Sequence, residues 1–327
     1  MERIHRRLTS DGAGGSVVLG SSSAPVTTGA GVWLRRLTSR GAAPYWQAAP
    51  LALVFVLFFV LPLALTVVVS FWRYNEYSIT PALVGDNYMS VFSGCLTDLP
   101  SLCLTFKTYL STLKFCLLAW GLTLALGFTI AYFLAFHVRS LAGQMALFLL
   151  CTIPFWTSNV IRMISWVPLL GRNGLVNGFL VSTGLAQQPA TWLLFSDFAV
   201  VLAFVHLYTM FMIVPIFNSM SRIDRALLEA ARDAGASGWQ ALWNVVVPLS
   251  KPGIVIGSIF VVTLVMGDYV TIGVMGGQQI ASVGKVIQVQ LSYLQFPLAA
   301  ANAVVLLAVV LMVIAAMTRL VDVRKEL

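Results

Sequence analysis

The chain has 327 residues, of which 59% are hydrophobic and only 10% are charged, and its formal net charge is +8. Ordinary soluble domains carry roughly a quarter charged residues, so this composition excludes a soluble globular protein and indicates that lipid surrounds much of the chain. The positive charge does not indicate nucleic-acid binding, because no basic stripe is interleaved with exposed aromatic residues.

The N-terminal segment, residues 1–44, is rich in Ser, Gly, Thr and Ala and lacks apolar periodicity. Such a segment cannot bury enough apolar surface to fold, so the sequence predicts a disordered cytoplasmic tail. It has no apolar region followed by a small-residue cleavage site, and we therefore expect no cleaved signal peptide. The rest of the chain is predicted to form a membrane domain over 45–320 and a short cytoplasmic tail over 321–327.

The membrane domain contains long apolar runs. A spanning helix needs about 20 apolar residues, because ~30 Å of hydrocarbon is crossed at a rise of about 1.5 Å per residue. Six runs meet this length, at 48–72, 109–136, 145–169, 198–220, 253–274 and 297–317. The sequence therefore predicts an all-α integral membrane protein with six transmembrane helices. A further short helix is expected at 174–185, lying on the membrane surface.

The positions of Lys and Arg predict the orientation. With the N-terminus inside, 14 of the 20 basic residues fall in cytoplasmic segments and 6 fall outside or within the membrane. Basic residues accumulate in cytoplasmic loops, so both termini are predicted to be cytoplasmic in a multi-pass protein of the inner (plasma) membrane. The same count places residues 221–252 in a cytoplasmic loop.

This loop is predicted to contain a helix over 223–234, which Gly235 ends. Alanine recurs there every four residues, at Ala226, Ala230 and Ala234, and gives a face that another surface can approach closely. Such a helix is either a lever that transmits the movement of a partner or an ordinary connection, and the periodicity alone leaves both open.

The loop continues with a second predicted short helix over 239–246. Pro248 and Pro252 then precede the fifth span and are expected to set its entry into the membrane.

The loop also carries a longer pattern, Glu229-Ala230-Ala231, then Gly235, then Val245-x-Val247-Pro248. This pattern resembles the EAA–Gly–(Ile-x-Leu-Pro) signature of type I permeases of binding-protein-dependent ABC importers, with valines where Ile and Leu are usual. The resemblance implies that the loop forms a coupling helix, which docks into a groove on an ATPase subunit. The residues it assigns to this coupling are Glu229, Ala230, Ala231, Arg232, Gly235, Val245, Val247 and Pro248.

Further motifs resemble the spermidine/putrescine branch of these permeases. They include Pro154-Phe155-Trp156-Thr157-Ser158, Ile161-Arg162, Leu170-Gly171-x-x-Gly174-Leu175-Val176-Asn177 and Gly267-Asp268-Tyr269. This likeness implies that the solute is a polyamine or another small organic cation. Related permeases for thiamine, ferric iron, sulfate and opine- or amino-acid-like solutes leave the identity of the solute open.

The resemblance also implies a set of partners. These are two ATP-binding cassette subunits, a second homologous permease chain, a periplasmic solute-binding protein and membrane lipid, with no nucleic acid. The chain has no GxxxxGK[ST] motif, so we expect it to bind no cofactor itself and expect ATP and Mg to be used by the ATPase partner.

Two ionisable residues, Arg162 and Asp268, fall within or at the edge of predicted spans. A charge in the membrane is costly, so each is expected to face a partner or an aqueous cavity. Asp268 either attracts a cationic solute or forms a local structural pair, with Arg162 or with backbone amides. Trp156, Trp166 and Tyr269 offer aromatic faces to an ammonium group, or serve as interfacial anchors and packing residues.

Cys95 and Cys103 share one polar segment that is predicted to lie outside. They either form a disulfide, if that compartment is oxidising, or remain two unlinked thiols.

Two other function classes fit the sequence less well. An intramembrane aspartyl protease would need a glycine where Val265 stands, and neither catalytic residues nor metal ligands are predicted. An ion-coupled secondary transporter would need its own coupling residues in the membrane, and only Arg162 and Asp268 are candidates.

Overall fold

The computed structural model describes residues 43–75, 78–93, 95 and 103–319 of the chain. The chain divides into two units, Met1–Pro62 and Leu63–Leu327. Both predicted tails lie outside the described residues, except that the first helix already begins at Ala43. In the described part, five helices are long and apolar enough to cross a membrane, or six if one bent pair is a single span.

The first predicted span is confirmed as a long helix made of α2 (Ala43–Phe55), the π-turn η1 (Val56–Val60) and α3 (Leu61–Val69). The turn lies directly before Pro62, which cannot donate a backbone hydrogen bond, and in it the Leu61 N–H donates to the Val56 carbonyl. This helix is apolar along most of its length, as a segment surrounded by hydrocarbon must be.

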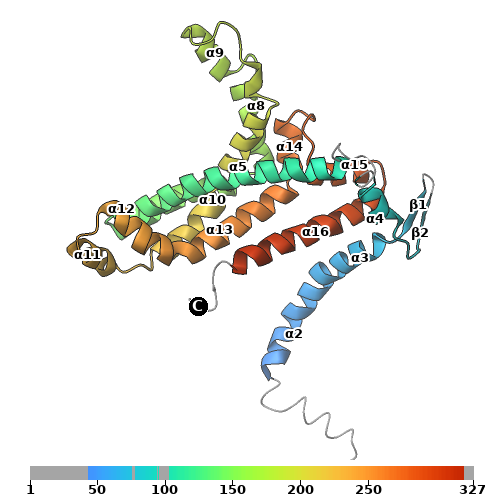
Figure 1. The fold of residues 1–327 in the computed structure, drawn as a ribbon, viewed down its shortest axis with the longest axis horizontal. Helices are drawn as coiled ribbons and strands as arrows, with labels where there is room; N and C mark the ends of the chain where they lie inside the picture. Colours follow the sequence, from blue (N-terminus) through green and yellow to red (C-terminus); the bar gives the residue numbers. More distant parts are fainter. Residues whose placement is uncertain (1–42, 76–77, 94, 96–102, 320–327) are drawn as a thin grey trace, which may run out of the picture. The chain divides into compact units, whose positions relative to one another are not determined.

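The core of the second unit is built by three long helices, α5 (Leu104–Tyr132), α10 (Asp197–Met220) and α13 (Val247–Gly267). Figure 1 shows them side by side, with α10 packed against both others. Together with α16 (Phe296–Arg319), these helices confirm the second, fourth, fifth and sixth predicted spans as membrane-length helices. The π-turn η2 (Phe133–His137) extends α5 at its C-terminal end.

Small residues allow these helices to approach closely. A Cβ on Gly253 of α13 would lie 2.4 Å from the Pro215 carbonyl oxygen, and one on Gly257 would lie 2.8 Å from the Met212 sulfur. The same methionine also meets α5, where a Cβ on Gly127 would lie 2.8 Å from Met212 Cγ. The three glycines therefore determine how near α5 and α13 come to α10.

The third predicted span, 145–169, is not one continuous helix but falls in a bent pair, Leu141–Trp156 and Asn159–Ser182, which together are long and apolar enough for one broken span or a re-entrant loop. The segment contains α6 (Leu141–Thr152), the 3₁₀ turn η3 (Ile153–Trp156), α7 (Asn159–Ile164), α8 (Trp166–Leu170) and α9 (Leu175–Ser182). Its two halves are bent by 91°. Thr157 and Ser158 leave the helical conformation with ψ values of 151° and 134°, and the Thr157 hydroxyl donates to the Pro154 carbonyl at 2.8 Å. The predicted surface helix at 174–185 corresponds to α9.

The fifth span begins earlier than predicted. The expected separate helix at 239–246 is instead the first part of one helix, Gly238–Gly267, made of α12 (Gly238–Ala241), the π-turn η5 (Leu242–Val246) and α13. The wider turn accommodates Pro248, because the Val247 N–H donates to the Leu242 carbonyl five residues back. The span also ends earlier than predicted, because Asp268 turns the chain into α14 (Val270–Met275).

Smaller elements pack near the start of α16. They are the antiparallel strands β1 (Arg73–Asn75) and β2 (Ser78–Thr80), α4 (Asp86–Val91) and α15 (Val283–Ser292). The amide of Asn87 donates to the carbonyls of Ser70 and Trp72, both at 2.8 Å, and so ties α4 to the preceding segment. The hairpin is a small departure from the predicted all-α fold.

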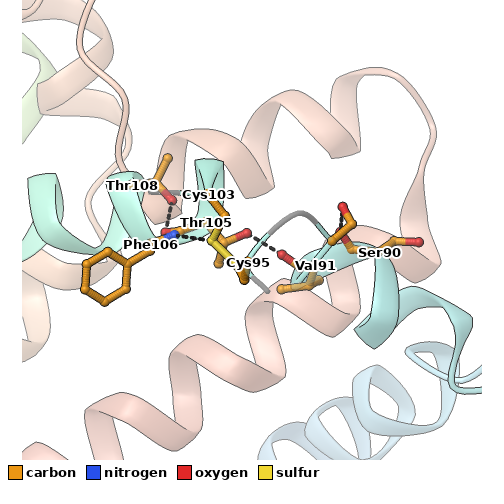
Figure 2. The surroundings of a disulfide bond; sticks show 8 residues. Ser90, Val91, Cys95, Cys103, Thr105, Phe106 and Thr108 are labelled. Carbon is orange, nitrogen blue, oxygen red and sulfur yellow. Dashed lines mark hydrogen bonds between the residues drawn. A yellow bond between two sulfur atoms is a disulfide. The ribbon is translucent and has the colours of Figure 1, made fainter. Parts of the chain in front are cut away.

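A disulfide joins Cys95 to Cys103 at the start of α5, with the two Cα atoms 4.7 Å apart (Figure 2). Cys103 is also the N-cap of α5, where its sulfur accepts from the Phe106 N–H at 3.4 Å. The Thr105 hydroxyl donates to the Val91 carbonyl at the end of α4. The disulfide and the Thr105 hydrogen bond therefore join the start of α5 to Cys95 and to the end of α4.

The close approach at Gly253 gives a test of the core. We expect Gly253→Ala to lower the free energy of unfolding by about 1–3 kcal/mol, because the added methyl group overlaps a backbone carbonyl. Thermal unfolding of the detergent-solubilised protein measures this loss. The matched control is Gly121→Ala on α5, where nothing lies within 4 Å of the new atom. Equal melting temperatures for the two variants would contradict the proposed close packing.

Candidate functional site

A cluster of polar side chains lies where α7 and α14 pack against α10. Arg162 of α7 exposes only 8% of its surface, and its guanidinium donates to the Asn159 side chain. It interacts electrostatically with Tyr208 and His206 of α10. Trp166 of α8 donates from its indole to His206 Nδ1 at 3.0 Å. Arg162 and Trp166, two of the residues predicted for the substrate pathway, thus both lie against α10.

Asp268, the third predicted residue, lies at the end of α13 and accepts three hydrogen bonds. The Tyr208 hydroxyl donates to it at 2.6 Å, and Thr271 donates from its backbone N–H at 2.9 Å and from its hydroxyl at 2.5 Å. Both carboxylate oxygens are therefore engaged within the chain. This geometry favours a structural role, fixing the turn between α13 and α14 and tying it to α10.

The two remaining aromatic residues, Trp156 and Tyr269, are exposed. Trp156 lies at the bend of the third span and exposes 83% of its surface, and Tyr269 exposes 44%. Both rings are thus free to meet a solute, lipid or another chain, whereas the Trp166 indole is already hydrogen-bonded.

His206 and Tyr208 were not predicted as site residues. Both could have been recognised as candidates because they are polar side chains within an otherwise apolar run. Such groups in a membrane helix need an internal partner. Their partners lie 40 and 60 residues away in the sequence, so the pairing was not visible without the structure.

The role of Asp268 as a structural tie is testable by replacing it with asparagine. We expect Asp268→Asn to lower the free energy of unfolding by about 1–3 kcal/mol, since bonds to a charged acceptor are lost. The matched control is Asp197→Asn, which removes an exposed ion pair with Lys114 and is expected to cost less than about 1 kcal/mol. A melting temperature unchanged in Asp268→Asn would rule out the tie.

The second candidate site is the helix α11 (Arg225–Asp233), between α10 and α12. Asp224 caps its start by accepting from the Ala226 N–H at 2.9 Å. Its end requires Gly235, whose φ is +85° and whose N–H donates to the Arg232 carbonyl at 2.8 Å. A residue with a side chain is strained in this left-handed conformation, so the predicted stop at Gly235 has a direct physical cause.

The charged and the small residues of α11 lie on two faces of the helix. The inner face, Arg225, Leu228, Glu229 and Arg232, lines a cavity of about 570 Å³ beside the C-terminal end of α5. The outer face is exposed and contains Ala226, Leu227, Ala230 and Ala234. Arg225, Glu229 and Arg232 are exposed as well, so the two faces differ in their chemistry and not in their access to a partner.

The other residues of the predicted coupling set lie outside α11. Ala231 is half-buried on the helix, and its carbonyl accepts from the Ala236 N–H at 2.9 Å. Val245, Val247 and Pro248 are half-buried in the long helix that begins at Gly238. They lie in η5 and at the start of α13 and do not share the exposed face of α11.

Comparison with known proteins gives one family. The family model for the inner membrane component of binding-protein-dependent transport systems matches residues 127–326. The spermidine/putrescine transport system permease protein PotB of Escherichia coli K12 is 33% identical over 253 residues, which cover 77% of this chain and 88% of PotB. The PotB protein of Salmonella typhimurium SL1344 is also 33% identical, over 77% of this chain and 84% of that protein.

The fold also matches a solved structure. A bacterial ABC transporter that imports the acidic polysaccharide alginate superposes with a TM-score of 0.66, over 88% of this chain and 98% of that chain. Its identity to this chain is 17%, so the likeness concerns the fold alone.

Proposed function

We propose that this chain, which belongs to the family of inner membrane components of binding-protein-dependent transport systems, carries a polyamine such as spermidine or putrescine through an ATP-driven importer. Family membership makes it a multi-pass permease subunit of the inner membrane, which is a transport subunit and not an enzyme. The observation that carries the solute assignment is the 33% identity to PotB over 253 residues, because this likeness covers most of both chains.

In this proposal, α11 receives work from a separate ATPase. Its outer face, with Ala226, Ala230 and Ala234 exposed, offers a small-residue surface that a partner can approach to backbone distance. The continuous helix from Gly238 to Gly267 then carries a displacement of α11 into the membrane. ATP-driven closure of two ATPase subunits would move α11 and open the pathway outward, and hydrolysis would reset it.

Family membership also supports other partners. A second, homologous permease chain would supply the other half of the pathway. A periplasmic binding protein would deliver the solute, as the alginate importer has been crystallised with such a protein bound. The exposed rings of Trp156 and Tyr269 remain the predicted contacts for a cationic solute, whereas Asp268 would act mainly by holding the turn.

Coupling through the outer face predicts a specific loss. We expect Ala230→Leu to reduce ATP-dependent uptake at least about tenfold while the protein still folds, because the larger side chain keeps the ATPase away from the α11 backbone. Uptake into proteoliposomes that contain the assembled transporter measures this. The matched control is Ala142→Leu, an equally exposed alanine on α6, which should retain normal uptake. Normal uptake by Ala230→Leu would exclude this face as the docking surface.

The solute assignment predicts selectivity. With the binding protein present, spermidine or putrescine should stimulate ATP hydrolysis by the reconstituted complex several-fold, and thiamine, sulfate and glycine betaine should not. Hydrolysis rates across this panel measure the preference, and an empty binding protein provides the baseline. Stimulation by one of the other solutes alone would reassign the permease within its family.

A further inference from the structure

The cavity beneath α11 is strongly basic. Arg225 and Arg232 reach it from α11, and His137 and Arg139 reach it from the end of η2 and the residues after it, against one carboxylate, Glu229. Among the described residues, none of these three arginines forms an ion pair with an acidic side chain. The cavity therefore has an uncompensated positive charge and is suited to an anion.

An apolar groove of about 650 Å³ adjoins the cavity, and the two share Tyr132 and Leu242 as lining residues. The groove runs between α5 and the long helix that begins at Gly238, from Trp239 and Trp243 to Leu124 and Ile254. Its lining is almost entirely hydrocarbon and aromatic. A basic cavity thus lies next to an apolar groove.

The position of this pair along the bundle matches the edge of a membrane. The helix Leu104–His137 has 34 residues. It is therefore about 50 Å long, and a hydrocarbon layer of about 30 Å centred on it would end near Tyr132. The groove then lies within the hydrocarbon and the cavity at the level of the lipid headgroups. Trp239 and Trp243, which are 67% and 52% exposed with ring centroids 5.6 Å apart, lie where interfacial tryptophans gather.

From these observations we propose that the cavity and the groove together bind one anionic phospholipid. Its phosphodiester lies among Arg139, Arg225 and Arg232, and one acyl chain occupies the groove beside Phe128 and Trp243. Glu229 is placed to accept a hydrogen bond from a hydroxyl group, which favours a headgroup such as that of phosphatidylglycerol over phosphatidylcholine. The bound lipid would join the end of α5 to α11 on the face opposite the exposed alanines, so a protein partner and the lipid need not compete.

The charge contacts are tested on the full-length protein in nanodiscs of phosphatidylcholine with increasing phosphatidylglycerol, with bound lipid counted by native mass spectrometry. We expect phosphatidylglycerol to be retained selectively, and Arg225→Gln with Arg232→Gln to weaken its binding on the order of tenfold, since each basic residue near an anionic surface contributes about 1 kcal/mol. Arg139→Gln alone, which leaves α11 unchanged, should weaken it several-fold. The matched control is Arg222→Gln with Lys251→Gln, which removes two charges that do not line the cavity.

The groove is tested separately with Ala125→Trp, which fills it, against Leu122→Trp, which places the same ring on α5 outside it. Only the first should reduce retention of phosphatidylglycerol. Equal retention of both lipids by the unmodified protein, or equal loss in the cavity and control variants, would overturn the proposal. Displacement of the lipid by millimolar inorganic phosphate would make the cavity a site for free anions instead. Unchanged lipid binding with loss of ATPase association in the arginine variants would assign the cavity to the ATPase.

Discussion

The packing of α10 against α5 and α13 is the constraint on which the rest of this membrane protein depends. Lipid tails are as apolar as the helix surfaces, so burial of hydrocarbon does not by itself drive helices together, and close van der Waals contact must do so. Gly127, Gly253 and Gly257 provide this contact around Met212 and Pro215. Tyr208 lies one turn from Met212, so the same packing brings its hydroxyl to the end of α13.

The sequence predicted those parts of the fold that depend on length and local chemistry. Five of the six predicted spans are membrane-length helices because hydrophobic length is set by the membrane, and the end of α11 was predicted because Gly235 allows a positive φ. The bend at Thr157 was missed because hydropathy counts apolar residues and is insensitive to backbone dihedrals. The continuity of the helix through Pro248 was missed because a π-turn accommodates a proline that the rules for ordinary helices treat as a break.

The candidate sites were predictable to different degrees for the same reason. The residues assigned to coupling are close in sequence, so a motif could group them, although it could not separate Glu229, which lines the cavity, from Ala230 on the outer face. The polar cluster around Tyr208 depends on pairs that are distant in sequence, and tertiary packing alone brings them together. Adjacent residues of one motif thus lie on different faces of the helix, because successive residues of an α-helix are rotated by about 100°.

The π-turn at Leu242–Val246 also has a geometric consequence for α11. One extra residue in a helical turn rotates everything before it by about 100° relative to an uninterrupted α-helix. The turn therefore fixes the direction, around the axis of the long helix, in which α11 leaves the bundle. The distance of α11 from the membrane does not change this direction. Deleting a single residue there would leave a regular helix with its hydrophobic length nearly unchanged. The deletion would point the alanine face in a different direction. We therefore expect insertions and deletions in Leu242–Val246 to be tolerated less well than substitutions there.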